Sequence, residues 1–103
     1  MIRESLLEGP KSVYDLWKDI LRKLENTSYA KPSYGSLRIM VYCLKRLGLI
    51  RKVSSLPSSK NAYYRKHLYA IVKARAKAEQ WHSPIEAYFY PARFKQRVHL
   101  KKL

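Results

Sequence analysis

Apolar residues recur every three or four positions in the first quarter of the chain. The repeating positions are Val13, Leu16, Trp17, Ile20, Leu21 and Leu24. This spacing is typical of an amphipathic helix, and Ser12 followed by Asp15 three residues later forms a capping signal. The pattern predicts a helix over residues 13–24. Its outward positions mix charges of both signs, as on a solvated supporting surface. They are Asp15, Lys18, Asp19, Arg22 and Lys23.

A second helical pattern covers residues 34–47. Its apolar positions are Leu37, Met40, Val41, Leu44 and Leu47. Ser33 is placed to cap the start, and Gly48 stands where a left-handed residue commonly ends a helix. Another face of this helix is predicted to carry Tyr34, Arg38, Tyr42 and Lys45, with Arg46 adjacent. Because the first four are spaced by four, four and three residues, they share one stripe.

Shorter elements flank these two helices. Ile2–Leu7 is predicted to be the end of a short helix that Gly9 and Pro10 close, since glycine is favoured just past a helix and proline cannot continue one. Glu25–Ser33 is dense in turn and cap formers and holds Pro32. This composition predicts a loop between the two longer helices.

A β-hairpin is predicted after Gly48. The run LIRKV is short, apolar and β-branched, SLPSSKN is rich in turn formers, and Ala62–Val72 has the aromatic and β-branched content of a returning strand. A helix is the alternative for that last run, because four of its residues also follow helical spacing: Tyr64, Leu68, Ile71 and Val72. The next segment, Lys73–Trp81, strongly favours helix. We therefore expect a strand and then a helix.

Aromatic and then basic residues dominate the C-terminal end. His82–Pro84 breaks the helical pattern, and the stretch that follows carries Ile85, Tyr88, Phe89, Tyr90 and Phe94. These side chains either pack on their own domain or contact neighbouring proteins. The residues that we predict for a protein contact are Tyr88, Phe89, Tyr90 and Phe94. The basic tail behind them is too short to build a core and such tails are usually disordered when free. We expect one domain over residues 1–81 and an aromatic and basic extension over 82–103.

Charge is distributed unevenly along the 103 residues. Residues 26–78 contain no Asp or Glu, yet they hold twelve of the 22 Lys and Arg residues and six of the nine tyrosines. The first 25 residues sum to zero and the last 25 to +3, so this acid-free segment carries +12 of the formal net charge of +15. Uncompensated positive charge repels itself in a compact protein. Its concentration beside aromatic rings points to a polyanion, nucleic acid above all.

Composition argues against several other classes of function. Cys43 is the only cysteine, so it cannot form an internal disulfide, and we expect it to be a small buried residue. The three histidines are at least fifteen residues apart, and the sequence has no glycine-rich nucleotide motif or nucleophile motif. We therefore expect no metal, no cofactor and no enzymatic activity. No apolar run approaches the roughly 18 residues of a membrane span, and the N-terminus lacks a signal-peptide layout. We expect a cytoplasmic protein that does not bind membranes.

Three helices followed by a hairpin give the chain a resemblance to the winged helix-turn-helix superfamily. The segments that carry it are LLEGPKSVYDLWKDI, SYGSLRIMVYCLKRLGLI and RKVSSLPSSKNAYYRK, within roughly residues 2–72. The resemblance implies an α+β fold, a winged helix of three helices and a β-hairpin wing, to which this sequence adds a C-terminal helix and a basic tail. It also implies that the third helix enters the major groove and that the wing touches the backbone or the minor groove.

The predicted nucleic-acid-binding residues fall into three groups. Carried over from the resemblance, the third helix supplies Ser33, Tyr34, Ser36, Arg38, Tyr42 and Lys45, and the wing supplies Lys52, Lys60, Arg65 and Lys66. The first group also includes two nearby cations, Lys31 of the preceding loop and Arg46 at the end of the helix. Charge adds Arg93, Lys95, Arg97, Lys101 and Lys102 of the tail. Lys and Arg contact phosphates and release counterions, while Tyr and Arg planes stack on unpaired bases. The alternatives are a solvated helix face for Arg38 and Lys45, and partial burial for Tyr42, Tyr64 and Tyr69.

The kind of polyanion is a further question. Charge continues beyond the predicted wing through Lys73, Arg75 and Lys77 into the tail, a pattern that resembles small ribosomal proteins whose basic tails thread between RNA helices. We therefore expect a winged-helix RNA-binding protein, a structural component of an archaeal-type ribosome. The alternative is a sequence-specific DNA-binding transcription regulator, although such regulators usually dimerise and the sequence has no long heptad repeat. A third reading is a protein-interaction module that uses Ile85–Phe94.

Overall fold

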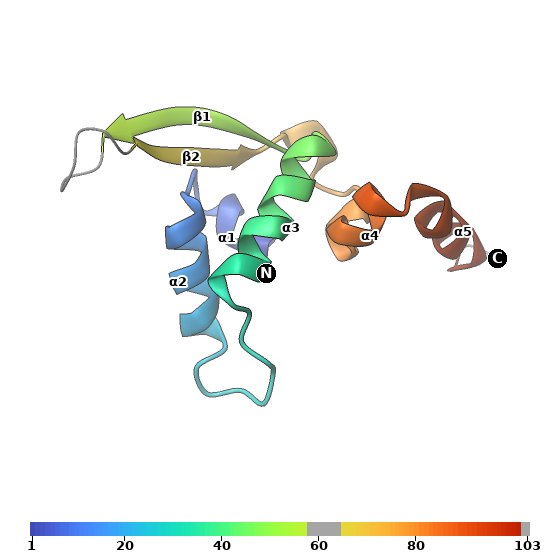
Figure 1. Cartoon of the computed structure of the whole chain (residues 1–103), viewed down its shortest axis with the longest axis horizontal. Coiled ribbons are helices and arrows are strands. Elements are labelled where there is room, and N and C mark those ends of the chain that lie inside the picture. Colours follow the sequence, from blue (N-terminus) through green and yellow to red (C-terminus); the bar gives the residue numbers. More distant parts are fainter. Residues whose placement is uncertain (58–64, 102–103) are drawn as a thin grey trace.

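The protein has a mixed α+β fold, seen in a computed structural model that describes the backbone of residues 1–57 and 65–101 and the side chains of residues 1–53 and 67–100 (Figure 1). The helices are α1 (Ile2–Leu7), α2 (Val13–Lys23), α3 (Tyr34–Arg46), α4 (Pro84–Phe89) and α5 (Pro91–Lys101), the strands are β1 (Ile50–Pro57) and β2 (Arg65–Ile71), and two short 3-10 turns are η1 (Lys73–Arg75) and η2 (Glu79–His82). The hairpin lies across one end of the first three helices, and α4 and α5 extend to one side (Figure 1). None of the described helices is long and apolar enough to cross a membrane.

Helices α2 and α3 begin and end where the sequence pattern predicts. The Ser12 hydroxyl accepts a hydrogen bond from the Asp15 backbone N–H at 3.1 Å, and the Ser33 hydroxyl does the same for Ser36 at 3.1 Å. Each cap satisfies a backbone donor that has no partner inside its helix. Gly48 ends α3 in the left-handed region, with a φ of 79°. Only glycine adopts this conformation without strain, so the chain turns here into β1.

The core lies between the first three helices and the base of the hairpin. Five apolar side chains are at most 2% exposed: Leu16, Leu37, Leu44, Leu49 and Ile50. They come from α2, α3, the turn after α3 and the first residue of β1, so one apolar stripe of each helix faces the core. Cys43 is fully buried, as predicted, and burial raises the pKa of its thiol. The core therefore fixes the position of α3 relative to β1.

Strands β1 and β2 form an antiparallel hairpin. Ile50 pairs with Ile71 and Lys52 with Tyr69, and the register shifts between Lys52 and Ser54. Tyr69 also exchanges two backbone hydrogen bonds with Lys11, at 3.0 and 2.9 Å, in the segment between α1 and α2. The strand prediction for the second arm is confirmed over β2, and its first residues, 62–64, lie outside the described residues. The sheet is thus anchored to the first two helices through Lys11.

The helix predicted over Lys73–Trp81 is wrong. The chain there makes the two short 3-10 turns η1 and η2 instead. Trp81 donates its ring N–H to the Arg75 carbonyl at 2.9 Å, and both Trp81 and Ala78 pack against the core. Arg3 of α1 donates to the Ala76 carbonyl at 3.3 Å. Docking on the core therefore overrides a strong local helix propensity.

The basic tail is folded through Lys101 rather than disordered. Pro91 starts α5, a place where proline is well tolerated because its missing N–H needs no partner. Phe94 of this helix is only 8% exposed. Arg97 donates to the Ser83 hydroxyl at 2.9 Å and pairs with Glu86 of α4 at 3.2 Å. Phe94 and Arg97 therefore attach α5 to the rest of the protein, which the charge and the length of the tail alone did not predict.

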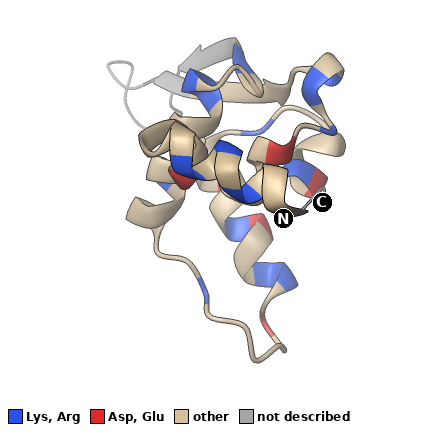
Figure 2. Ribbon diagram, turned by 90° about the vertical axis from the view of Figure 1, so that its right-hand side faces the viewer, with Lys and Arg blue, Asp and Glu red and all other residues tan. Residues whose placement is uncertain are grey.

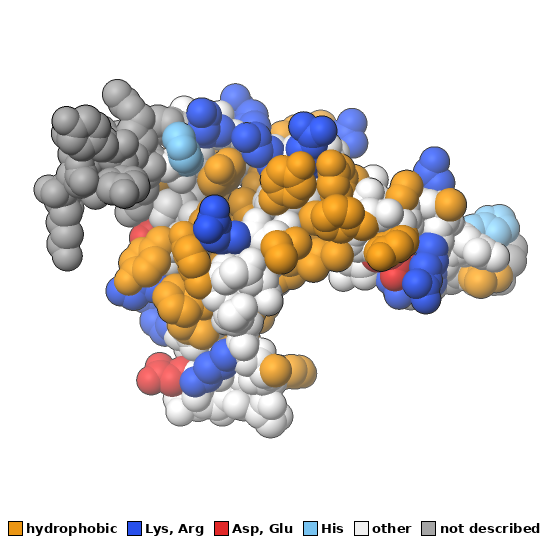
Figure 3. Space-filling view, in the orientation of Figure 1, with side chains coloured by type: hydrophobic (Ala, Val, Ile, Leu, Met, Phe, Trp, Pro, Cys, Tyr) orange, Lys and Arg blue, Asp and Glu red, His pale blue; other side chains and the backbone are white. Residues whose placement is uncertain are grey.

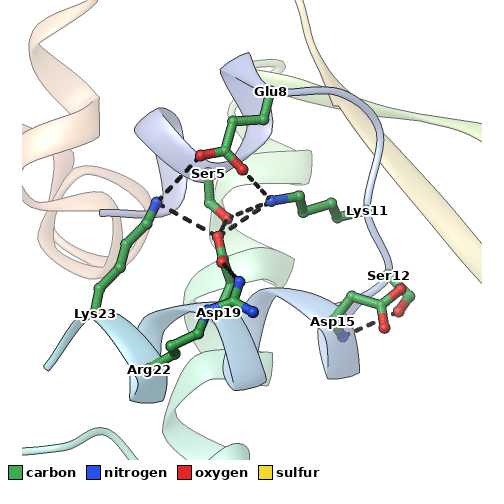
Figure 4. A network of polar contacts seen from close by, with 8 residues as sticks. All are labelled: Ser5, Glu8, Lys11, Ser12, Asp15, Asp19, Arg22 and Lys23. Atoms are coloured by element: carbon green, nitrogen blue, oxygen red, sulfur yellow. Dashed lines mark hydrogen bonds and ion pairs between the residues drawn. The ribbon is translucent and has the colours of Figure 1, made fainter. Parts of the chain in front are cut away.

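Asp19 of α2 is buried, with 4% of its side chain exposed, so the prediction that it lies on a solvated surface is wrong. Its carboxylate accepts a hydrogen bond from the Ser5 hydroxyl of α1 and pairs with Lys11 Nζ at 3.1 Å (Figure 4). Arg22 and Lys23 approach it from its own helix, with Lys23 Nζ at 3.4 Å. The Ser5 and Lys11 partners come from α1 and the segment that follows it, so the spacing along α2 could not reveal them.

This polar network joins α1 to α2. Hydrogen bonding from Ser5, and then from Lys11 and Arg22, holds the pKa of Asp19 well below its ordinary value. Lys11 also pairs with Glu8 at 2.8 Å, and that hydrogen bond is the main reason why the pKa of Lys11 is raised. Removing one partner of a buried ion pair leaves the other charge without compensation. The network therefore holds α1 and α2 together, and its member Lys11 also joins them to β2 through Tyr69.

Candidate nucleic-acid interface

Exposed Lys and Arg side chains gather around the corner where α3 ends, β1 begins and η1 follows β2. This basic surface consists of Lys45, Arg46, Arg51, Lys52, Lys73, Arg75 and Lys77. Backbone hydrogen bonds from Leu49 N to Leu44 O at 3.0 Å and from Val72 N to Leu49 O at 2.9 Å fix the corner. Figure 3 shows Lys and Arg side chains gathered along the hairpin and the end of α3.

The basic surface is uncompensated within the described part of the chain. None of its side chains has a carboxylate at ion-pair distance among the residues described, and the hairpin ribbon carries basic positions without acidic ones (Figure 2). The ion pairs described instead join α1 and α2 with the segment between them, and α5 with α4. Cations without a carboxylate partner favour the binding of a polyanion, because their contacts with its phosphates release the counterions bound there.

The predicted stripe on α3 is present and largely exposed. Arg38 and Lys45 are exposed, and Tyr42 is 50% exposed. Tyr34, at 38%, lies instead in an aromatic cluster, with its ring centroid 5.5 Å from Trp17 and 6.4 Å from Tyr14. Tyr34 therefore helps to pack α2 against the start of α3, and the remaining three residues form the accessible stripe.

Helix α4 packs on the outer face of α3. The ring of Tyr88 is edge-on to Tyr42, with centroids 5.8 Å apart and an interplanar angle of 89°. Hydrogen bonding with Arg46 lowers the pKa of Tyr88, while hydrogen bonding with Tyr88 raises the pKa of Tyr42. Two of the predicted contact residues, Tyr42 and Arg46, are thus engaged by α4. The aromatic stretch divides accordingly, with Tyr88 docked on α3, Phe94 buried, and Phe89 and Tyr90 exposed.

The other predicted residues are not all brought together. Lys31 is exposed in the α2–α3 loop, and the hydroxyls of Ser33 and Ser36 bond to each other at 3.0 Å in the α3 cap. Lys52 belongs to the basic surface. Helix α5 lies at the opposite end of the molecule from the far ends of the described strands (Figure 1), and its exposed cations are Arg93, Lys95 and Arg97. Lys60, Lys102 and the side chains of Arg65, Lys66 and Lys101 lie outside the described residues.

Four members of the basic surface were not among the predicted binding residues. They are Arg51, Lys73, Arg75 and Lys77. Arg51 lies at the start of β1, and the other three lie in the segment Lys73–Trp81 that is predicted to be a helix. All four belong to the acid-free segment 26–78, so the charge pattern itself was the signal that could have found them.

Comparison with known proteins finds no protein family, curated protein or solved structure that matches this chain. Among the described residues, no group of three His, Cys, Asp or Glu side chains is placed to hold a metal ion. The charge and geometry of the basic surface and of the face shared by α3 and α4 are therefore the basis for a functional proposal.

Proposed function

We propose that the protein binds nucleic acid through the basic surface and that it favours RNA over duplex DNA. The observation that carries the proposal is the gathering of seven exposed cations at one corner with no carboxylate partner in the described part of the chain. Each phosphate that such a cation neutralises releases bound counterions, which makes binding favourable at low salt. Arg51 and Lys52 of this surface lie on β1.

We also propose that residues 2–72 form a winged helix. Three helices precede a two-stranded hairpin, and Lys11 between α1 and α2 bonds to Tyr69 of β2 as a third, single-residue strand. In this arrangement α3 is the helix nearest the nucleic acid and the hairpin is the wing. The cations of the basic surface then lie at the junction of these two parts.

The position of α4 favours RNA. Insertion of α3 into the major groove of DNA requires a free outer face, but Tyr88 occupies part of that face at Tyr42 and Arg46. Folded RNA presents wide, shallow minor grooves and unpaired loops, which a basic corner contacts without helix insertion. The exposed cations of α5 extend the positive charge away from the body. A structural component of an archaeal-type ribosome is the setting we propose.

A DNA-binding transcription regulator is the second candidate. It is favoured by the order of helices and strands, together with the exposure of Ser36 and Arg38 in the first half of α3, where recognition helices contact base edges. This function requires that a duplex of one sequence is bound more tightly than a scrambled duplex. It also predicts a dimer in solution, because paired half-sites are read by paired domains.

The test is a salt series with one structured RNA and one duplex DNA of equal length. Lys52→Ala is expected to weaken binding to RNA and to reduce the slope of log K against log salt by roughly one. Lys18→Ala on α2 removes the same charge from an exposed position outside the basic surface and is the matched control. Equal losses in both variants contradict this location, and no binding of either nucleic acid contradicts the function. Co-sedimentation with ribosomal particles through high salt tests the ribosomal setting, and sequence-dependent retention of duplex DNA supports the regulator instead.

A further inference from the structure

A groove of about 490 Å³ lies between α3 and α4, lined by Gly35, Arg38, Ile39, Tyr42 and Phe89. Tyr42 and Phe89 are 50% and 51% exposed, so each ring leaves a large part of its surface to solvent. Figure 3 shows apolar side chains gathered over the junction of these helices. Exposed aromatic rings beside a groove are a surface on which a flat ligand can stack.

Tyr88 contacts the rings of both Tyr42 and Phe89, the two aromatic residues that line the groove. Its ring centroid is 5.8 Å from that of Tyr42 and 4.9 Å from that of Phe89, with edge-on geometry in both pairs. The two walls are therefore ordered before a ligand arrives. A ligand that finds ordered side chains does not bear the entropic cost of immobilising them.

The groove has open space beside Gly35 and a positive charge from Arg38. A Cβ added to Gly35 would meet no heavy atom within 4 Å, so the first turn of α3 is open on this side. Arg38 lies one turn further along and brings a guanidinium to the groove. Among the described residues, no carboxylate forms an ion pair with Arg38. The groove therefore joins two aromatic surfaces to one uncompensated cation.

We propose that this groove binds one unpaired nucleobase, which stacks on the exposed surfaces of Phe89 and Tyr42 while Arg38 contacts the adjoining phosphate. This site rests on the proposed function and specifies which feature of the RNA is bound. Every base has a π face, so such stacking tolerates any sequence. Bases inside a continuous duplex are already stacked and paired. The groove consequently distinguishes bulges, loops and ends from uninterrupted helices.

A protein segment is the competing occupant, and charge argues against it. Arg38 lines the groove, and Lys45 and Arg46 follow about two turns later on the same helix, with no acidic residue on α3. A second copy of this chain would bring a formal charge of +15 toward another +15. Like charges of this size oppose close approach, whereas a nucleotide brings its own negative phosphate.

The experiment uses the full chain and two RNA hairpins that differ by one bulged nucleotide, 2-aminopurine, whose fluorescence falls when it stacks. The wild type is expected to bind the bulged hairpin about tenfold more tightly than the continuous one and to quench the probe. Phe89→Leu keeps an apolar side chain but removes the ring, and it is expected to lose most of the preference and of the quenching. Tyr90→Leu, an equally exposed aromatic of the same stretch outside the groove, is the control and should keep both.

The outcomes separate this site from the proposed function. If the wild type binds both hairpins equally and leaves the probe fluorescent, the nucleobase site is wrong while RNA binding through the basic surface stands. If neither hairpin is bound, both proposals fail. If sedimentation shows a wild-type dimer that Phe89→Leu dissociates while hairpin preference is unchanged, the groove is a protein interface and the nucleobase site is again wrong. Because two of these measurements use only the wild type, a variant that fails to fold does not obstruct the test.

Discussion

Tyr88 of α4 stands edge-on to Tyr42 of α3, with ring centroids 5.8 Å apart. This pair attaches the C-terminal helices to the face of α3 that the sequence predicted to be a free binding stripe, and the neighbouring Arg46 lowers the pKa of Tyr88. The contact therefore decides how much of α3 a nucleic acid can reach.

Loss of the Tyr88 ring is expected to loosen α4. An edge-on aromatic pair contributes about 0.5–1.5 kcal/mol, so Tyr88→Ala should raise hydrogen exchange in α4 and α5 by roughly two- to tenfold. Binding of duplex DNA relative to RNA should rise at the same time, because the outer face of α3 becomes accessible. Hydrogen exchange read by mass spectrometry and paired titrations measure both effects. Tyr90→Ala is the control, and the same exchange increase in that variant would count against a specific role for Tyr88.

Asp19 makes the folded state sensitive to acid. Its folded pKa is lowered from an ordinary value of 3.8, so its contribution to stability is present above that value and is lost as the pH falls through the folded pKa. The free energy of unfolding of the wild type should therefore keep the contribution of Asp19 from about pH 5 to 7. Below about pH 4 this contribution should decrease progressively. Denaturant unfolding at a series of pH values measures this dependence.

Asp19→Asn is expected to flatten that dependence below pH 4 and to destabilise the protein at pH 7 by roughly 1.5–3 kcal/mol, because Ser5 and Lys11 lose the charged acceptor that they share while Lys11 keeps its pair with Glu8. Glu25→Gln removes one negative charge from an exposed position at the end of α2 and should change stability by less than about 0.5 kcal/mol. An Asp19→Asn protein as stable as the wild type at pH 7 would contradict the role given to the network in Figure 4.

Two glycine substitutions are expected to have opposite signs. Gly48 has a φ of 79°, so Gly48→Ala should destabilise the protein by about 1 kcal/mol although the added Cβ meets nothing within 4 Å. Gly35 lies inside α3 and also has open space, so Gly35→Ala should stabilise it by up to about 1 kcal/mol. Thermal unfolding of both variants checks the signs. A loss of stability in both would show that the added methyl groups, rather than the backbone, are responsible.

The basic arm α5 is expected to contribute more to RNA binding than to DNA binding. Removing residues 92–103 should weaken RNA binding far more than DNA binding, because the described cations among them, Arg93, Lys95 and Arg97, lie on α5, away from the hairpin. Arg93→Gln with Lys95→Gln removes two exposed charges while leaving the buried Phe94 in place, and should reproduce part of that loss. Electrophoretic titration at fixed salt compares the variants. Equal losses on RNA and DNA would contradict the RNA preference.

Local signals predicted the parts of the fold that depend on neighbours in the sequence. Apolar spacing, the Ser12 and Ser33 caps and Gly48 placed α2 and α3 correctly to within a residue or two. The hairpin was predicted from β-branched content, and β2 confirms the strand over the helix alternative. In each case the deciding interactions are within a few residues of one another.

The parts that were not predicted depend on distant partners. Asp19 is buried because Ser5 and Lys11 reach it, and Trp81 breaks a favourable helix because it packs on the core. Tyr88 docks on α3 across more than forty residues of sequence. For the candidate site, the acid-free segment 26–78 contains every member of the basic surface that we propose. It could not show that α4 occupies part of α3, because Tyr88 and Tyr42 are far apart in the sequence.

The most direct test of the central claim is the affinity of the full-length protein for one structured RNA and one duplex DNA of equal length at matched salt. If the basic surface binds RNA as proposed, the RNA is bound more tightly, the affinity falls steeply with salt, and Lys52→Ala weakens it while Lys18→Ala does not. Tighter binding of one duplex DNA over its scrambled sequence and over the RNA, or no binding of either nucleic acid, would contradict the account.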